Sequence, residues 1–190
     1  MSLVERLAAR LALTDTTPPR DDARRAAVAA VIDADDRVLL MKRTERTGDP
    51  WSGHVSLPGG RYELADGDLL ATAIRETREE LDVDLVAART LGNLPALHPM
   101  NAGKHGIEVT PFVFAATGPL VPRTGDEAAA VFWLPLPLAA AGTYDATYEY
   151  APAHMTFPSW AFETHTIWGL TLRILRMVLE AAERPPTSPG

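Results

Sequence analysis

Three closely spaced glutamates are the strongest chemical feature of this sequence. Glu76, Glu79 and Glu80 stand at positions i, i+3 and i+4 of the segment 58–83, PGGRYELADGDLLATAIRETREELDV. In a helix, which advances about 100° per residue, these spacings place the three carboxylates on one face within about one turn. Like charges so placed destabilise an isolated helix by about 0.2–0.5 kcal/mol per pair, so we expect a bound cation to compensate.

The donor chemistry indicates a hard metal ion. Carboxylate oxygens, together with a nearby backbone carbonyl, suit Mg²⁺ or Mn²⁺. The chain has no cysteine, so thiolate sites for soft metals are excluded. We therefore expect Mg²⁺ or Mn²⁺ to be bound by the carboxylates of Glu76, Glu79 and Glu80 and the carbonyl of Gly60. Taken alone, glutamates on a helix more often form a solvated face. The surrounding sequence decides between this alternative and a metal site.

Apolar residues of the same segment predict where the helix lies. Together with Thr77 they fill a sector of the helical wheel that begins beside the carboxylates, and they are Leu69, Leu70, Ala73, Ile74 and Leu81. The helix is therefore expected to pack on a core, with its acids at the edge of a cleft.

This segment resembles the signature of the Nudix hydrolases. That pattern is Gly, five residues, Glu, seven residues, Arg-Glu, an aliphatic residue, any residue, Glu-Glu, any residue, Gly and an aliphatic residue. The run 75–83 matches the second half, with Thr77 at the aliphatic position and Asp82 in place of Gly. In the first half, Gly60 is followed after five residues by Asp66, and eight rather than seven residues separate Asp66 from the Arg-Glu pair.

The insertion, with Asp in place of Glu, is similar to the branch of the family that cleaves coenzyme A. In that branch a second signature comes first: Leu-Leu, Thr, any residue, Arg, Ser, three residues, Arg, three residues, Gly, three residues, Phe-Pro-Gly-Gly. The chain matches it at Leu39, Leu40, Arg43, Gly53, Pro58, Gly59 and Gly60, with Thr44 for Ser and Leu57 for Phe. One extra residue after Thr44 moves the second arginine to Arg46. The resemblance implies that Arg43 and Arg46 bind substrate phosphates, for which the guanidinium fork is suited; the alternative is an ordinary polar loop.

The resemblance also implies a fold and the roles of further residues. The Nudix fold is an α/β/α sandwich with a mixed sheet. Arg75 matches the family arginine that orients a catalytic glutamate. The general base is either Glu79 within the helix or Glu127, just before an expected strand at 130–134.

The expected activity is metal-dependent hydrolysis of a nucleoside diphosphate linked to another moiety. The leading substrate is coenzyme A or acyl-CoA, giving 4'-phosphopantetheine and adenosine 3',5'-bisphosphate. The alternatives are another Nudix pyrophosphatase, acting on NADH, ADP-ribose or a nucleoside triphosphate, and a non-catalytic module that binds nucleotide. Because homodimers are frequent in the family, a homodimer is a further expectation.

Composition bounds the setting in which this chemistry occurs. With 190 residues, 46% of them hydrophobic, the chain suits one domain, with an N-terminal extension over 1–24 and a flexible tail over 184–190. A net charge of -7 argues against nonspecific binding of nucleic acid or anionic membrane. The absence of cysteines, of a secretory signal and of an apolar run long enough to cross a bilayer leads us to expect a cytoplasmic protein.

Hydrophobic patterning predicts the remaining elements. They are a short helix near 3–11, a hairpin of strands 25–32 and 37–41, a strand at 85–94, a loop at 97–106, a strand at 107–115, a hairpin of strands 143–150 and 154–162, and a helix over 166–183. Trp168 is predicted to belong to the core, and Trp51 to pack within its loop.

Overall fold

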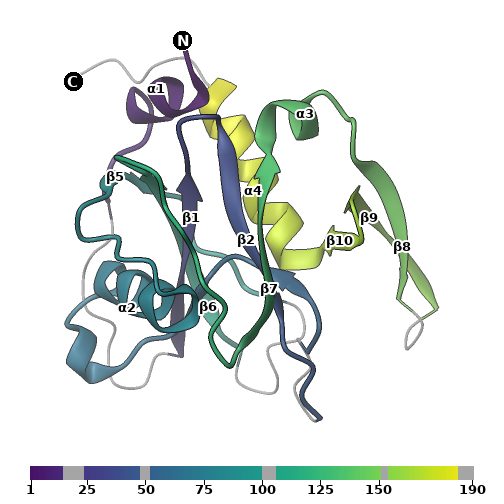
Figure 1. The fold of residues 1–190 in the computed structure, drawn as a ribbon, viewed down its shortest axis with the longest axis horizontal. Coiled ribbons are helices and arrows are strands. Elements are labelled where there is room, and N and C mark those ends of the chain that lie inside the picture. Colours follow the sequence, from purple (N-terminus) through teal and green to yellow (C-terminus); the bar gives the residue numbers. More distant parts are fainter. Residues whose placement is uncertain (15–23, 48–51, 100–105, 151–153, 184–190) are drawn as a thin grey trace.

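A mixed sheet lies between helices in the computed structural model, which describes residues 1–14, 24–47, 52–99, 106–150 and 154–183 (Figure 1). The elements in chain order are α1 (Leu3–Ala8), β1 (Arg25–Ile32), β2 (Arg37–Arg43), β3 (Val55–Ser56), β4 (Gly59–Arg61), the 3₁₀ turn η1 (Leu64–Asp66), α2 (Leu69–Leu81), β5 (Arg89–Asn93), β6 (Glu108–Ala115), β7 (Ala128–Pro135), α3 (Leu136–Ala140), β8 (Asp145–Tyr150), β9 (Met155–Phe162), β10 (His165–Trp168) and α4 (Gly169–Glu183). The predicted α/β/α sandwich with a mixed sheet is confirmed.

The main sheet has seven strands, five of them in the order β3-β2-β1-β6-β5. In addition, β4 pairs with β1, and β7 pairs with β2. Among the described strands of this sheet, the pairing of β1 with β6 is parallel and the other pairings are antiparallel. The predicted hairpin of β1 and β2 is present, with Ile32 opposite Val38.

The central strand β1 separates two apolar cores, because successive side chains in a strand point to opposite faces. Ala27, Ala29 and Val31 lie in the core that includes Leu69, Ala73 and Leu81 of α2. Ala30 and Ile32 lie in the other core, which includes residues of α1 and α4. Helices therefore cover both faces of the sheet, with α2 on one side and α1 and α4 on the other (Figure 1).

The predicted N-terminal extension contributes to the fold. Leu3 and Leu7 of α1 are buried in the core that contains α4. The side chain of Ser2 accepts a hydrogen bond from the backbone of Glu5, and the carboxylate of Glu5 accepts one from the backbone of Ser2. This reciprocal cap explains why so short a helix begins at Leu3.

A second sheet is formed by β8, β9 and β10 in the order β10-β9-β8. The pairing of β8 with β9 is antiparallel and confirms the predicted hairpin. The strand β10 pairs with β9 and packs against β3 of the main sheet. The small sheet thereby extends the molecule to one side of the sandwich (Figure 1).

The predicted boundaries are wrong at two elements. The last helix was expected from Thr166, but residues 165–168 form β10 and α4 begins at Gly169. Gly169 has φ of 61°, a left-handed conformation that glycine adopts readily and that separates the strand from the helix. The strand expected over 85–94 is confined to Arg89–Asn93, since Leu85 to Ala88 form a turn closed by a backbone hydrogen bond of 3.0 Å.

Several expectations lie wholly or partly outside the described residues. These are the tail 184–190, the packing of Trp51 and most of the loop 97–106. Among the residues that the structure does describe, no helix is long and apolar enough to cross a membrane.

Candidate active site

Local interactions stabilise both ends of the helix α2, which carries the three glutamates. At its start, the Asp68 carboxylate accepts a hydrogen bond of 2.7 Å from the backbone N–H of Ala71. At its end, Asp82 adopts a left-handed conformation with φ of 55°, which asparagine and aspartate tolerate better than other side chains. Within the helix, the buried hydroxyl of Thr77 donates to the carbonyl of Ala73 at 2.7 Å, so a polar residue is accepted where the Nudix pattern has an aliphatic one.

The Pro-Gly-Gly turn approaches α2 closely. The backbone N–H of Gly59 donates to the Glu80 carboxylate at 2.9 Å. At Gly60, a Cβ atom would lie within 2.7 Å of Oε2 of Glu76. The second glycine therefore lets the carboxylate of Glu76 lie directly against the backbone of β4, where a residue with a Cβ atom would collide with it.

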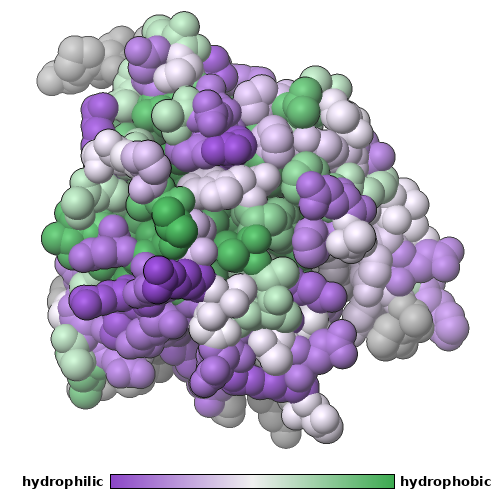
Figure 2. Space-filling view, viewed as in Figure 1, coloured by the Kyte–Doolittle hydropathy of each residue, from purple (hydrophilic) through white to green (hydrophobic). Residues whose placement is uncertain are grey.

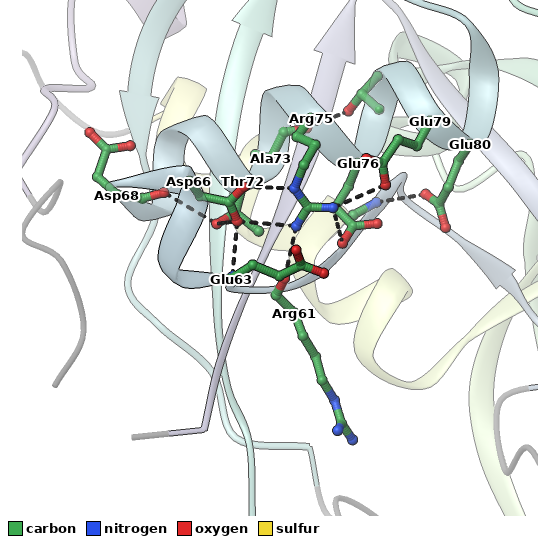
Figure 3. A network of polar contacts seen from close by, with 12 residues as sticks. Arg61, Glu63, Asp66, Asp68, Thr72, Ala73, Arg75, Glu76, Glu79 and Glu80 are labelled. Carbon is green, nitrogen blue, oxygen red and sulfur yellow. Dashed lines mark hydrogen bonds and ion pairs between the residues drawn. The ribbon is translucent and has the colours of Figure 1, made fainter. Parts of the chain in front are cut away.

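Arg75 is the centre of the polar network on this face of α2 (Figure 3). Its Nη1 donates to Glu76 Oε1 and to Glu79 Oε2, each at 3.0 Å. Its Nη2 donates to the carbonyl of Arg61 at 3.0 Å. The predicted pairing of Arg75 with Glu79 is therefore present, and the same guanidinium also ties the helix to β4.

Asp66 holds the other edge of the Arg75 guanidinium. Nε and Nη2 of Arg75 donate to the two Asp66 oxygens at 2.6 and 3.1 Å, and the Thr72 hydroxyl donates at 2.8 Å. The backbone N–H of Glu63 donates at 3.0 Å. The one-residue shift in the sequence pattern thus leaves an acid in contact with the arginine, because η1 folds Asp66 back onto α2 (Figure 3).

The pKa of Asp66 is lowered by this setting. Burial of its side chain, which is 3% exposed, raises the pKa, but the hydrogen bonds from Arg75, Glu63 and Thr72 outweigh burial. A carboxyl whose folded pKa is below the unfolded value of about 3.9 stabilises the fold above that pH and loses this contribution as the pH falls through its folded pKa.

Asp66→Asn is expected to destabilise the protein by about 1–3 kcal/mol at pH 7, because it removes the charge that satisfies Arg75. The difference in unfolding free energy between the variant and wild type should shrink below about pH 4, where the wild-type carboxyl also becomes protonated. Urea unfolding between pH 3 and 7 measures both effects. Asp68→Asn is the matched control, since asparagine also caps helices and should cost little. An equal loss in the two variants would contradict the anchoring role of Asp66.

Glu80 is the most buried of the three glutamates, with a side chain 3% exposed. The pKa of Glu80 is raised to about 7, chiefly by burial and also by the charges of Glu76 and Glu127, although the Gly59 hydrogen bond and the charge of Arg43 lower it. The pKa of Glu76 is also raised by burial, despite its contact with Arg75. The local positive charge therefore does not fully compensate these carboxylates.

Two arginines face the glutamates across one cavity of about 1120 Å³. Arg43 Nη1 lies 3.9 Å from Glu80, and Arg46 Nη1 lies 3.0 Å from Glu127. The cavity brings together all of the predicted site residues, namely Arg43, Arg46, Gly60, Arg75, Glu76, Glu79, Glu80 and Glu127. Hydrophilic side chains gather on the surface over α2 in the space-filling view (Figure 2).

The carboxylates share a cavity without forming a gathered metal site. Across the described ranges, no three carboxylate, imidazole or thiolate groups are arranged to hold a metal ion as they stand. Instead Glu76 and Glu79 contact Arg75, and Glu80 contacts Gly59. The donor set nevertheless fits a hard divalent cation, because it consists of oxygens and carries uncompensated negative charge. The metal roles of these residues therefore stay a prediction.

Part of the cavity wall was not anticipated from the sequence. Tyr150, Phe157 and Trp168 of the small sheet line the cavity, although Trp168 was expected in the core. Trp168 is only partly buried. The one local signal is the pair Tyr148 and Tyr150, which share a face because residues two apart in a strand point the same way.

Comparison with known proteins places this geometry in a family. A model described as the NUDIX domain matches residues 22–154. An uncharacterized Nudix hydrolase, NudL of Salmonella paratyphi B, is 34% identical over 139 residues, which are 70% of this chain and 70% of that protein. A second NudL, from Salmonella newport, matches with the same identity and coverage.

Solved structures share the fold at low sequence identity. A MutT/nudix family protein from Enterococcus faecalis has a TM-score of 0.57 at 16% identity, covering 90% of this chain and 66% of that one. The NUDIX domain of Shewanella oneidensis NrtR, complexed with ADP ribose, has a TM-score of 0.53 at 16% identity, covering 83% and 87%. A bifunctional NMN adenylyltransferase/ADP ribose pyrophosphatase from Francisella tularensis, complexed with AMP and a Mn ion, has a TM-score of 0.54 at 19% identity, covering 86% and 43%. From the matched domain, the NudL relatives and the arrangement of α2, we conclude that this chain belongs to the Nudix hydrolase family.

Proposed function

We propose that the chain hydrolyses a diphosphate that links a nucleoside to a second moiety, and that coenzyme A or an acyl derivative is the substrate. The products are 4'-phosphopantetheine and adenosine 3',5'-bisphosphate. The observation that carries the proposal is the single cavity in which the α2 glutamates face Arg43 and Arg46.

The part of the cavity between the arginines and α2 combines the positive and the negative side chains that this reaction requires. Arg43 and Arg46 supply guanidinium groups that pair with phosphate oxygens. Glu76, Glu79 and Glu80, with the Gly60 carbonyl, are the residues that would hold Mg²⁺ or Mn²⁺. When bound, such an ion neutralises diphosphate charge and makes water easier to deprotonate.

The proposed reaction adds one water molecule across the phosphoric anhydride. The water oxygen forms a bond to one phosphorus, the bridging P–O bond breaks, and the bridging oxygen stays on the other phosphate. A glutamate accepts the proton that the water loses. Glu79 and Glu127 both line the cavity, and each contacts an arginine, so the proposal assigns the proton to one of these two.

The position of the second signature, the one that resembles the coenzyme A branch of the family, supports coenzyme A as the substrate. Its two arginines, Arg43 and Arg46, and its glycines, Gly59 and Gly60, all line the cavity. The cavity is also large, at about 1120 Å³, and has apolar walls on both the main sheet and the small sheet. A substrate with a bulky group on each side of its diphosphate uses both walls, whereas a nucleoside triphosphate has a bulky group on one side only.

ADP-ribose is the second candidate. It also carries a group on each side of the diphosphate, and the Shewanella oneidensis NrtR domain shares this fold in a complex with ADP ribose. The two candidates differ in the second moiety, a pantetheine or a ribose, and in the phosphate on the ribose of the nucleoside, which coenzyme A has and ADP-ribose lacks.

Purified protein with Mg²⁺ or Mn²⁺ is expected to release adenosine 3',5'-bisphosphate from coenzyme A at least about 10-fold faster than it cleaves NADH, ADP-ribose or a nucleoside triphosphate. The two-sided cavity favours coenzyme A over a nucleoside triphosphate. Against NADH and ADP-ribose the preference follows from the phosphate on the ribose, which coenzyme A alone carries among these three, one charged contact being worth about a factor of 10. Chromatographic separation of the products measures all four reactions in parallel. Glu80→Gln serves as the control for contaminating hydrolases, since its preparation should show little turnover. Faster cleavage of ADP-ribose, with coenzyme A intact, would overturn the proposed substrate.

A further inference from the structure

A cluster of aromatic rings forms the small-sheet side of the cavity. Trp168 is its centre, with ring centroids 5.4 Å from Tyr150 and 5.6 Å from Phe157. Tyr148 supports the Trp168 ring at 4.5 Å, and His54 meets it edge-on at 5.1 Å. We name Tyr150, Phe157 and Trp168, the three of these that come from the small sheet and line the cavity, the aromatic wall.

The aromatic wall is packed together yet retains accessible surface. Each of its three residues is only partly buried. Trp168 contacts the other two rings in tilted arrangements, so its position is fixed by its neighbours. A rigid aromatic surface that lines a cavity provides a platform on which a flat ring can stack without ordering new side chains.

The main-sheet side of the cavity has a different character. Strands β1 and β6 and the loop residues before β6 line it with the aliphatic or cyclic side chains of Ala26, Val28, Pro99, Ile107 and Val109. These side chains offer contact to a flexible alkyl or amide chain, and the imidazole of His98 beside Pro99 adds one ring, whereas the aromatic wall presents three. Of the two sides, the aromatic wall is therefore the better match for a purine base.

An arginine lines the cavity from α4, the helix that begins directly after Trp168 of the aromatic wall. Arg173 of α4 lines the cavity, five residues after Trp168, and its side chain is exposed. Within the described part of the chain it has no ion-pair partner, whereas Arg43, Arg46 and Arg75 all face carboxylates. A guanidinium in this position favours an anionic group on the part of the ligand that stacks on the wall.

We infer that the aromatic wall and Arg173 form the nucleoside half of the substrate site, with the purine base on the wall and a ribose phosphate at Arg173. This inference rests on the proposed function and extends it, since it assigns one arm of the substrate to the small sheet and the other to the aliphatic side. It also supplies a physical reason for preferring a nucleotide with a phosphorylated ribose to ADP-ribose.

Equilibrium binding of the nucleotide product tests the assignment without requiring turnover. The probes are adenosine 3',5'-bisphosphate, AMP and ribose 5-phosphate, measured by calorimetry. Arg173→Gln is expected to weaken the binding of adenosine 3',5'-bisphosphate about 10-fold and the binding of AMP less than about twofold, because only the former carries the extra phosphate. Arg176→Gln replaces an exposed arginine of the same helix that is not among the residues lining the cavity, and it should change neither Kd.

The aromatic wall is tested with Tyr150→Leu, which retains apolar bulk. It should weaken the binding of adenosine 3',5'-bisphosphate and of AMP about 10-fold each and leave the binding of ribose 5-phosphate unchanged, because only the first two carry a base. Phe157→Leu provides the same test if the first variant does not fold, as judged by its melting temperature. Equal weakening of both adenine nucleotides in Arg173→Gln, or unchanged Kd values in the folded wall variants, would overturn the inference.

The two proposals fail in distinguishable ways. If no diphosphate is hydrolysed while the pattern of Kd values is as expected, the proposed function is wrong and the nucleoside site stands. If coenzyme A is cleaved but the Kd values of the Arg173 and Tyr150 variants equal those of wild type, the reaction stands and the inferred site is wrong.

Discussion

Glu80→Gln is expected to lower kcat on the order of 10²–10³-fold while the melting temperature stays the same or rises. The carboxylate is 3% exposed, and burial together with the charges of Glu76 and Glu127 raises its pKa to about 7. A carboxyl whose pKa is raised on folding is destabilising where it is ionised, that is, at and above neutral pH. Glutamine removes that charge but can still accept the hydrogen bond from Gly59. With the predicted metal role of Glu80, catalysis loses a ligand of the metal ion, whereas the metal-free fold is relieved of a destabilising charge.

The measurement pairs steady-state kinetics with thermal unfolding in the presence of a chelator. Glu180→Gln is the matched control, since it makes the same substitution on the exposed face of α4, away from the cavity. Its kcat and melting temperature should both equal those of wild type. Wild-type turnover in Glu80→Gln would remove Glu80 from the metal site, and a large fall in its melting temperature would show that the buried charge is structural.

The part of the site that lies on α2 could be predicted because its geometry is local, whereas Arg43, Arg46 and Glu127 lie far from α2 in the sequence and were predicted from the family resemblance. Glu76, Glu79 and Glu80 share one face through helical spacing alone, and the structure places them along one cavity. The pairing of Arg75 with Glu79 follows from the same i, i+4 spacing. Asp66 was one residue out of register with the expected pattern, and only the fold of η1 shows how that residue reaches Arg75.

The apolar half could not be predicted because its contacts are between distant segments. Trp168 meets His54 and Tyr150, and these three residues come from separate parts of the chain. Whether an aromatic residue in an amphipathic segment faces a core or a cavity depends on which sheets pack together, and local periodicity does not contain that information. The error at the start of α4 has the same origin, since the strand β10 is defined by its pairing with β9.

Gly59→Ala is expected to destabilise the protein by roughly 2–5 kcal/mol, because it combines backbone strain with a clash inside the sheet. Gly59 has φ of 150°, a conformation that residues with a Cβ rarely adopt. It pairs with Val28 of β1, and a Cβ atom would meet the carbonyl oxygen of Ala27 and lie 2.6 Å from Cα of Val28. Both are backbone atoms of the central strand, so the clash cannot be relieved by a side-chain rotation.

Gly67→Ala separates the two causes in the same assay of urea unfolding. Gly67 also has a positive φ, of 81°, but no atom lies within 4 Å of its would-be Cβ, so only the strain of about 1 kcal/mol should be measured. The additional loss of unfolding free energy in Gly59→Ala, compared with Gly67→Ala, then measures how tightly β4 is held against β1. Since Gly59 also donates to Glu80, that packing fixes the most buried glutamate relative to the sheet. Equal losses at the two glycines would mean that β4 can move away from β1, and the position of Glu80 would then have to depend on α2 alone.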